Sequence, residues 1–256
     1  MTASRRVLVT RAAAQAAPTV AALRKVGLDP VLVPAIEIDL APAGSDIDSA
    51  ARWLPSYRWV VITSPNGARA ILKAAERVFT PFEASRFAAI GSATRSALEV
   101  EGVDVEFEPS LSTAASLATE LPVASGDRVL VVRGDLAGDN VATTLRQRGA
   151  LVDDVVGYST REAPSASVRL LRDALEAGPF AAIVFTSGST VRGLVALGAG
   201  AHIDVRDVPA ICIGPQTAAA AGGVGFKVAA VAPDPNPRAV ARMTASVVVR
   251  QPREIR

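Results

Sequence analysis

An internal repeat limits the folds that this chain can adopt. RVLVTR at positions 6–11 recurs as RVLVVR at positions 128–133, displaced by 122 residues. VITSPNGARAIL at 61–72 matches VFTSGSTVRGLV at 184–195, displaced by 123 residues. Segments 90–105 and 213–228 match at that same displacement. Three collinear matches predict two halves with the same structure.

Each half repeats one pattern: an apolar, β-branched run, then a loop rich in Gly, Ser and Thr, then an amphipathic stretch rich in Ala and Leu. This alternation is typical of parallel strands connected by helices, so we expect the α/β class with two parallel sheets flanked by helices. The expected strands lie at 7–10, 31–33, 60–63, 88–90, 103–107, 129–132, 152–155, 182–185, 210–213 and 228–231.

The loops of this pattern are the candidate ligand-binding segments. Open parallel sheets bind ligands beyond the carboxyl ends of their strands, where helix N-termini present unpaired N–H groups and a partial positive charge. A helix N-cap explains any single Ser, Thr or Asn there equally well, but recurrence of the loops in both halves favours a ligand with several negative groups. The candidate residues are Arg11, Thr63, Ser64, Pro65, Asn66, Gly91, Ser92, Thr94, Arg133, Gly134, Thr186, Ser187, Gly188, Ser189, Gly214, Pro215, Gln216 and Thr217.

Composition excludes several other classes of protein. Half of the residues are hydrophobic and 20% are charged, which is enough apolar material for packed cores. The net charge is only +2 and aromatic residues make up 4%, so neither a polybasic stripe nor a base-stacking surface for nucleic acid is expected. No apolar run reaches membrane-spanning length, and Arg11 interrupts the first one before a signal-peptide core is complete. We expect neither a membrane anchor nor export.

The sequence lacks the usual motifs for nucleotide binding, for serine hydrolases and for metal binding. The sequence contains no GxxxxGK[ST], no GxGxxG after a strand and no GxSxG. The single histidine, His202, lies in a loop-like segment where a solvated side chain is expected, and the single cysteine, Cys212, lies in an apolar run that predicts burial. The adjacent Asp153 and Asp154 are expected on opposite faces of a strand, which disfavours a paired-carboxylate site. No metal site is predicted.

Tyr158 is the candidate catalytic side chain. It follows the expected strand at 152–156 in VVGYST, near the point where one half gives way to the other. Its hydroxyl can donate a proton or a hydrogen bond to a leaving group. A tyrosine with a packed ring and a solvated hydroxyl is the structural alternative.

The order of the motifs resembles that of the uroporphyrinogen-III synthase family, over nearly the whole chain. The motifs that carry the resemblance are TR at 10–11, P-x-I-E-I at 34–38, TSPNGA at 63–68, IGSAT at 90–94, VRG at 132–134, GYST at 157–160, FTSGST at 185–190, IGPQTA at 213–218 and PNPRAV at 235–240. Each motif is short, and their order and spacing together make the resemblance specific.

This resemblance implies a domain arrangement that the repeat alone does not. The repeat suggests a cut near residue 125, whereas the family implies two similar three-layer, flavodoxin-like α/β domains with a cleft between them. The first domain would comprise residues 1–36 and 160–256, and the second would comprise 40–155. Residues 34–40 and 156–163 would form a two-stranded linker.

The resemblance also implies an activity that needs no cofactor. The family's substrate is hydroxymethylbilane, a linear tetrapyrrole with acetate and propionate side chains, and its product is uroporphyrinogen III. The terminal hydroxyl leaves to give an azafulvene, ring D attacks through its substituted carbon, and a spiro intermediate recloses with ring D inverted. Tyr158 matches the family tyrosine proposed to help the hydroxyl leave, and Thr217 matches a threonine lining the cleft. Other cleft-lining positions match Thr63, Ser64, Thr94, Ser187 and Ser189.

Two positions depart from the family pattern, and two other functions remain open. Gly188 stands where relatives often have proline, and Gln216 where they often have a small hydroxyl residue. An inactive ligand-sensing or regulatory protein with the same fold is the main alternative, although the end of the chain at Arg256 leaves no room for a helix-turn-helix domain. A hinged solute-binding protein is the other alternative. We expect a cytoplasmic monomer, with hydroxymethylbilane synthase as a candidate upstream partner.

Overall fold

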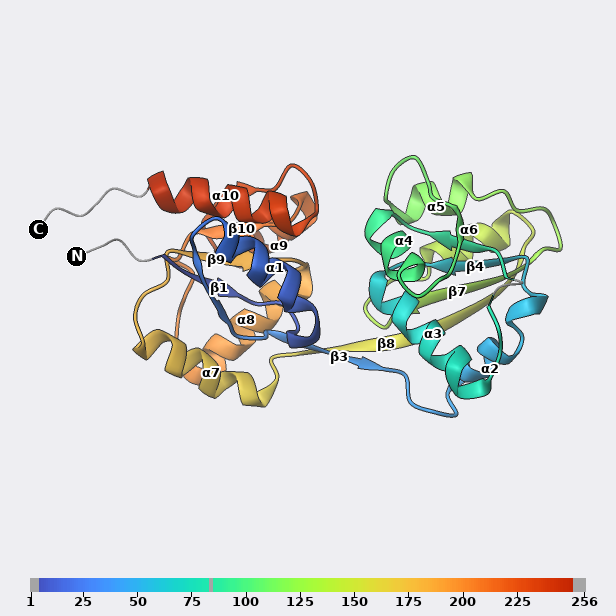
Figure 1. The fold of residues 1–256 in the computed structure, drawn as a ribbon, viewed down its shortest axis with the longest axis horizontal. Helices are drawn as coiled ribbons and strands as arrows, with labels where there is room; N and C mark the ends of the chain where they lie inside the picture. Colours follow the sequence, from blue (N-terminus) through green and yellow to red (C-terminus); the bar gives the residue numbers. More distant parts are fainter. Residues whose placement is uncertain (1–4, 83–84, 251–256) are drawn as a thin grey trace, which may run out of the picture. The chain divides into compact units, whose positions relative to one another are not determined.

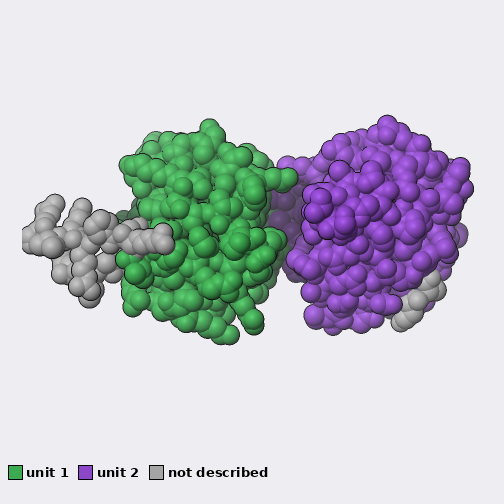
Figure 2. Space-filling view, turned by 90° about the horizontal axis from the view of Figure 1, so that it is seen from above, with its two compact units in different colours: residues 1–37, 161–256 green, residues 38–160 purple. Residues whose placement is uncertain are grey.

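The computed structural model describes residues 5–82 and 85–250 and divides into two compact units (Figure 1). Unit 1 comprises residues 1–37 and 161–256, and unit 2 comprises residues 38–160 (Figure 2). The chain therefore passes from unit 1 to unit 2 after Glu37 and returns after Thr160. Residues 251–256, at the end of the chain where no room for a helix-turn-helix domain was expected, lie outside the described residues.

Unit 1 is built on a five-stranded parallel sheet of order β11-β10-β9-β1-β2. Counted along the chain, this is the order 2-1-3-4-5 of a flavodoxin-like sheet. The strands are β1 (Arg6–Val9), β2 (Asp29–Leu32), β9 (Ala182–Phe185), β10 (Ala210–Cys212) and β11 (Val228–Val231), and the helices are α1 (Ala13–Lys25), α7 (Ser165–Glu176), α8 (Gly188–Ala201), α9 (Pro215–Gly223) and α10 (Pro237–Arg250).

The side chains of β1 show how the three layers of unit 1 form. Val7 and Val9 pack with Leu23 of α1 and with Val240 of α10 on one face of the sheet. Leu8 points to the other face, where the core is completed by α7, α8 and α9. Alternate residues of a strand point to opposite faces, so a continuous apolar run is what a sheet covered on both faces requires.

Unit 2 has a six-stranded sheet of order β3-β8-β7-β4-β5-β6. Strands β8 to β6 are parallel and are covered by α2, α3 and α4 on one face and by α5 and α6 on the other. The strands are β3 (Ile36–Leu40), β4 (Trp59–Ile62), β5 (Phe87–Ala89), β6 (Val105–Phe107), β7 (Arg128–Gly134) and β8 (Leu151–Glu162). The helices are α2 (Asp46–Arg52), the 3-10 turn η1 (Leu54–Ser56), α3 (Pro65–Val78), α4 (Ser92–Glu99), α5 (Ala114–Glu120) and α6 (Asn140–Gln147).

The expected parallel-sheet α/β class is confirmed, and the expected strands are found within a few residues of their expected bounds. One element differs. The strand expected at 152–155 and the linker strand expected at 156–163 are a single strand, β8, of 12 residues. Tyr158 therefore lies within a strand and does not follow one. The amide of Ala163 donates to the carbonyl of Ala35, and that of Ala41 donates to Gly157, so β3 runs antiparallel to β8.

The internal repeat maps onto matching strands of the two sheets. At displacements of 122 and 123, β1, β4, β5 and β6 correspond to β7, β9, β10 and β11, and the sheet orders superimpose as β11-β10-β9-β1-β2 on β6-β5-β4-β7-β8. Each unit thus combines strands from both copies of the repeat. A cut near residue 125 would divide both sheets.

Candidate functional site

The carboxyl end of β1 and that of its neighbour β9 form the topological switch point of unit 1. At such a point the connections leave in opposite directions and open a crevice that binds ligands in α/β proteins. Arg11 follows β1, and Thr186–Gly188 follows β9. The Thr10 hydroxyl bridges the two strands by donating to the carbonyl of Val184 over 2.8 Å.

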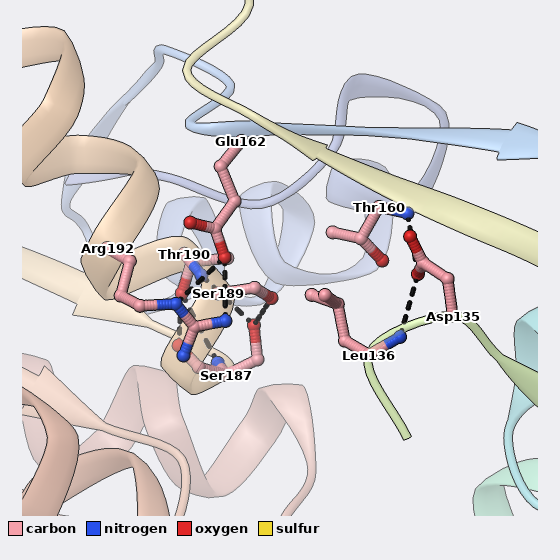
Figure 3. A network of polar contacts seen from close by, with 8 residues as sticks. All are labelled: Asp135, Leu136, Thr160, Glu162, Ser187, Ser189, Thr190 and Arg192. Carbon is pink, nitrogen blue, oxygen red and sulfur yellow. Dashed lines mark hydrogen bonds and ion pairs between the residues drawn. The ribbon is translucent and has the colours of Figure 1, made fainter. Parts of the chain in front are cut away.

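Ser187 caps helix α8 at this edge of unit 1 (Figure 3). Its hydroxyl accepts from the amide of Thr190, whose own hydroxyl accepts from the amide of Ser187, at 3.2 Å in each case. Ser187 and Ser189 hydroxyls lie 2.8 Å apart. Such a capping box stabilises a helix by about 1 kcal/mol. Ser187 and Thr190 therefore have a structural role in starting α8, whether or not a ligand also binds at this loop.

The equivalent edge of unit 2 joins Ser64 to Tyr158. Ser64 caps α3 by accepting from the amide of Gly67 over 3.0 Å, and its hydroxyl donates to that of Tyr158 over 3.0 Å. Thr63 donates to the carbonyl of Val132 on β7, also over 3.0 Å. The predicted residues of TSPNG and GYST, which are 94 positions apart at Ser64 and Tyr158, are therefore in contact within one unit.

Tyr158 lies against Gly134 and beside a small cavity. A Cβ added at Gly134 would meet the Tyr158 ring at 2.6–2.8 Å, so glycine is required for the ring to lie there. The cavity has a volume of about 180 Å³ and is lined by Thr63, Arg133, Asn140 and Tyr158, among others. The half-buried hydroxyl of Tyr158 is thus held at the carboxyl edge of the sheet, close to β7.

The other two predicted loops begin helices without a capping side chain. Gly91 is the N-cap of α4 and Gly214 is the N-cap of α9. Thr94 and Thr217, in the first turns of these helices, are only 2% and 6% exposed, whereas Ser92 and Gln216 are exposed. The N–H groups of these first turns receive no side-chain cap, which leaves them suited to an anion.

The two predicted arginines have different surroundings. Arg133 Nε donates to both carboxylate oxygens of Asp154, at 2.9 and 3.1 Å, and Arg133 Nη1 donates to the carbonyl of Ala137. Its charge is already neutralised within unit 2. Arg11 is partly buried, and within residues 5–82 and 85–250 its buried Nε has no hydrogen-bond partner.

Two polar groups near the carboxyl edges were not predicted. In unit 1, Arg192 donates to Glu162 from Nε and Nη2, at 2.9 and 2.6 Å (Figure 3). In unit 2, Asp135 accepts from the amides of Leu136 and Thr160, at 2.9 and 3.0 Å. The match of Arg69 with Arg192 in the repeat was the available signal for the first pair. The contacts of Asp135 depend on how β8 ends, which the sequence pattern does not specify.

The residues set aside in the sequence lie as expected. His202 is exposed at the end of α8, and Cys212 is fully buried, which raises the pKa of its thiol to about 11. Asp153 accepts from Tyr57 while Asp154 binds Arg133, so the adjacent carboxylates do have separate partners. In the described part of the chain, no cluster of His, Cys, Asp and Glu could hold a metal ion, and no helix is both long and apolar enough to cross a membrane.

The fold and these edges define a class: a duplicated α/β protein in which two parallel sheets of one strand arrangement each carry glycine- and hydroxyl-rich helix N-termini. A family model described as uroporphyrinogen-III synthase HemD matches residues 17–242. The chain belongs to the uroporphyrinogen-III synthase family, which confirms the resemblance seen in its motifs.

Relatives and solved structures agree with this assignment. The chain is 30% identical over 229 residues to the uroporphyrinogen-III synthase of Chlorobaculum parvum (87% of this chain, 90% of that protein), and 29% identical over 224 residues to that of Synechococcus elongatus (82% and 83%). It is 28% identical to the porphyrin biosynthesis protein HemD of Ruminiclostridium josui, covering 84% of this chain but 43% of that protein. The fold matches a mutant uroporphyrinogen III synthase of Thermus thermophilus with a TM-score of 0.66 at 20% identity, covering 96% of this chain and 99% of that one. The Helicobacter pylori uroporphyrinogen-III synthetase matches with a TM-score of 0.63 at 16% identity, covering 95% and 99%.

Proposed function

We propose that this protein is a uroporphyrinogen-III synthase, a lyase that closes hydroxymethylbilane to uroporphyrinogen III with inversion of ring D and release of water. The observation that carries the proposal is the pair of matched switch points, one in each unit, in a chain that belongs to this enzyme family. A sensor that has lost turnover would keep the same fold, but no feature of the chain favours it.

The carboxyl edges suit a substrate with many carboxylates. Helix N-termini carry unpaired N–H donors and about half a positive charge, and each favours a bound anion by up to about 1 kcal/mol at an exposed site. The first turns of α4 in unit 2 and α9 in unit 1 have no capping side chain, so no capping side chain competes with an anion for their amides. Several weak anion sites, used together, would hold a flexible bilane in one conformation.

In this proposal the protein acts mainly by controlling conformation. The bilane can also close without inversion, so the substituted carbon of ring D must reach the electrophile before the free carbon does. Holding two reacting atoms in the correct geometry supplies much of the barrier reduction in intramolecular reactions. The two units would grip different carboxylates, and the expected cleft between them stays a prediction.

Tyr158 is proposed to assist departure of the terminal hydroxyl. Its own hydroxyl accepts a hydrogen bond from Ser64, so its proton remains able to point toward a leaving group. Release of water requires one proton on the departing oxygen, and a phenol held beside a cavity at the sheet edge can supply it. The group is half-buried, which limits competition from solvent.

Several finer expectations remain proposals. We propose that the two compact units are separate domains, that the protein acts as a monomer, and that hydroxymethylbilane synthase supplies the substrate. A cytoplasmic location is consistent with a single cysteine that is buried.

The proposed function is tested by supplying freshly made hydroxymethylbilane under anaerobic conditions and separating the product isomers by chromatography. We expect the type III isomer to predominate with the protein and the type I isomer to predominate without it. Accumulation of type I alone at every protein concentration would contradict the proposal, and would favour the inactive regulatory protein.

A further inference from the structure

The repeat places Arg11 of unit 1 and Arg133 of unit 2 at equivalent positions. RVLVTR ends in Arg11, and RVLVVR ends in Arg133, at the carboxyl ends of the corresponding strands β1 and β7. Equivalent positions of the repeat therefore place an arginine in two environments within the same chain. The difference between those environments indicates what each arginine does.

In unit 2 the arginine has a carboxylate partner on the neighbouring strand. Val131 of β7 lies opposite Asp154 of β8 in the parallel register, and Asp154 receives two hydrogen bonds from Arg133 Nε. The side chains of this pair are 19% and 11% exposed, so the pair is well shielded from water. Arg133 is held by its own unit.

In unit 1 the carboxylate is replaced by leucine. Val9, the equivalent of Val131, lies opposite Leu32 of β2. Leu32 therefore occupies the register position of Asp154, and it packs against the apolar cluster formed with α1 and α10. The counter-ion of Arg133 has no equivalent on the strand beside Arg11.

Arg11 is consequently a partly buried cation without a partner among the described residues. Its Nε is buried and unbonded there, and no ion pair of Arg11 is found in residues 5–82 and 85–250. Burial lowers the pKa of the Arg11 guanidinium, as expected for a charge removed from water without compensation. Leaving such a group unpaired is costly, and a bound anion would recover that cost.

The surroundings of Arg11 favour an anion from outside the protein. Arg11 lies at the switch point of a 2-1-3-4-5 sheet, where α/β proteins bind ligands. Immediately after it, Ala12 is the N-cap of the 13-residue helix α1 and provides no side-chain cap. Arginine matches a carboxylate with two parallel hydrogen bonds, and the N-terminus of α1 adds N–H donors.

We propose that Arg11 is a substrate-binding residue of unit 1, which receives one acetate or propionate carboxylate of the tetrapyrrole, whereas Arg133 has become structural. The ligand assignment rests on the proposed function. Because Leu32 supplies no internal counter-ion, Arg11 is left to bind an external carboxylate.

The test restores the missing carboxylate. Leu32→Asp supplies unit 1 with the counter-ion found in unit 2, and Leu32→Asn is the matched control, equal in size and polarity but uncharged. Dissociation constants for uroporphyrinogen III are measured anaerobically at low salt by fluorescence or calorimetry. We expect Leu32→Asp to weaken binding about tenfold or more, the factor set by about 1.4 kcal/mol, and Leu32→Asn to change it less than threefold.

A second pair of variants removes the arginines themselves. Arg11→Gln is expected to weaken binding about tenfold and to reduce its dependence on salt, because one charge contact is lost. Arg133→Gln is expected to lower the melting temperature, because it leaves the Asp154 carboxylate without its ion-pair partner. The salt dependence of binding is expected to stay as in the wild type. A merely structural role for Arg11 would lower the melting temperature and leave the salt dependence unchanged.

The outcomes separate this inference from the proposed function. Wild-type turnover to the type III isomer, with unchanged binding by both Leu32→Asp and Arg11→Gln, would overturn the role of Arg11 and leave the function standing. Binding of uroporphyrinogen III that depends on Arg11, in a protein that never yields the type III isomer, would support Arg11 and overturn the function.

Discussion

At the scale of single residues, side-chain partners follow strand register, which the sequence pattern specifies only partly. The alternation of a strand was sufficient to predict that Asp153 and Asp154 point to opposite faces, and their different partners, Tyr57 and Arg133, agree with that prediction. The identity of each partner was not predictable, because Arg133 lies diagonally to Asp154 on β7 and Tyr57 reaches Asp153 from the end of the 3-10 turn η1. The capping role of Ser187 was foreseeable as an alternative, since Ser before a helix commonly caps it.

The first prediction concerns the two tyrosines of unit 2. Tyr158→Phe is expected to lower kcat roughly tenfold to a hundredfold without abolishing turnover, because a general acid is lost while the conformational control remains. Tyr57→Phe is the matched control: its hydroxyl bonds Asp153 over 2.5 Å, and it should lower stability by about 1–3 kcal/mol but leave kcat unchanged. Steady-state kinetics and thermal unfolding of both variants check this. Equal kcat for Tyr158→Phe and wild type would remove Tyr158 from the mechanism.

At the scale of elements, the existence of strands and helices was predictable and their lengths were less so. Apolar runs bounded by small-residue loops placed β9 at its observed bounds, Ala182–Phe185. The length of β8 was missed because its second part, Val156–Glu162, alternates between exposed and partly buried residues and contains Gly157. Such a segment gives a weaker strand signal than a run buried on both faces.

Helix α8 supplies the second prediction, from two of its glycines. A Cβ at Gly193 would lie 2.0 Å from the carbonyl oxygen of Ala35, whereas a Cβ at Gly200 would meet nothing closer than 3.9 Å. Gly193→Ala is therefore expected to destabilise unit 1 by at least about 1–3 kcal/mol, because helix and backbone must separate. Gly200→Ala should be neutral or stabilise by up to about 1 kcal/mol through helix propensity. Denaturant unfolding of the two variants decides this, and equal stabilities would contradict the close packing.

At the scale of the whole molecule, the repeat predicted similarity but not the boundaries of the compact units. Matching segments reveal that two sheets are alike, yet they do not reveal that each sheet takes strands from both copies. The discontinuous arrangement came from the resemblance to a family. Pairing of β1 with β9, about 175 residues further along the chain, leaves no local mark in the sequence.

The third prediction follows from the fact that each sheet takes strands from both copies of the repeat. A fragment of residues 38–160 contains the five parallel strands of unit 2, with β8 lacking only its last two residues, and is expected to unfold cooperatively as an isolated domain. A fragment of residues 1–125, cut where the repeat alone suggests, lacks β7 and β9 and should not form a stable core. Circular dichroism and thermal melting compare the two. Cooperative unfolding of the second fragment alone would show that the boundaries are wrong.

We propose that helix N-termini at the carboxyl edges of both sheets hold one polycarboxylate ligand. Amide hydrogen–deuterium exchange, measured anaerobically with and without uroporphyrinogen III, tests it most directly. We predict slower exchange at the start of α4 in unit 2, and at the starts of α1 and α9 in unit 1. Slower exchange confined to one unit, or to segments away from these edges, would show that the helix N-termini of the two units do not hold the ligand together.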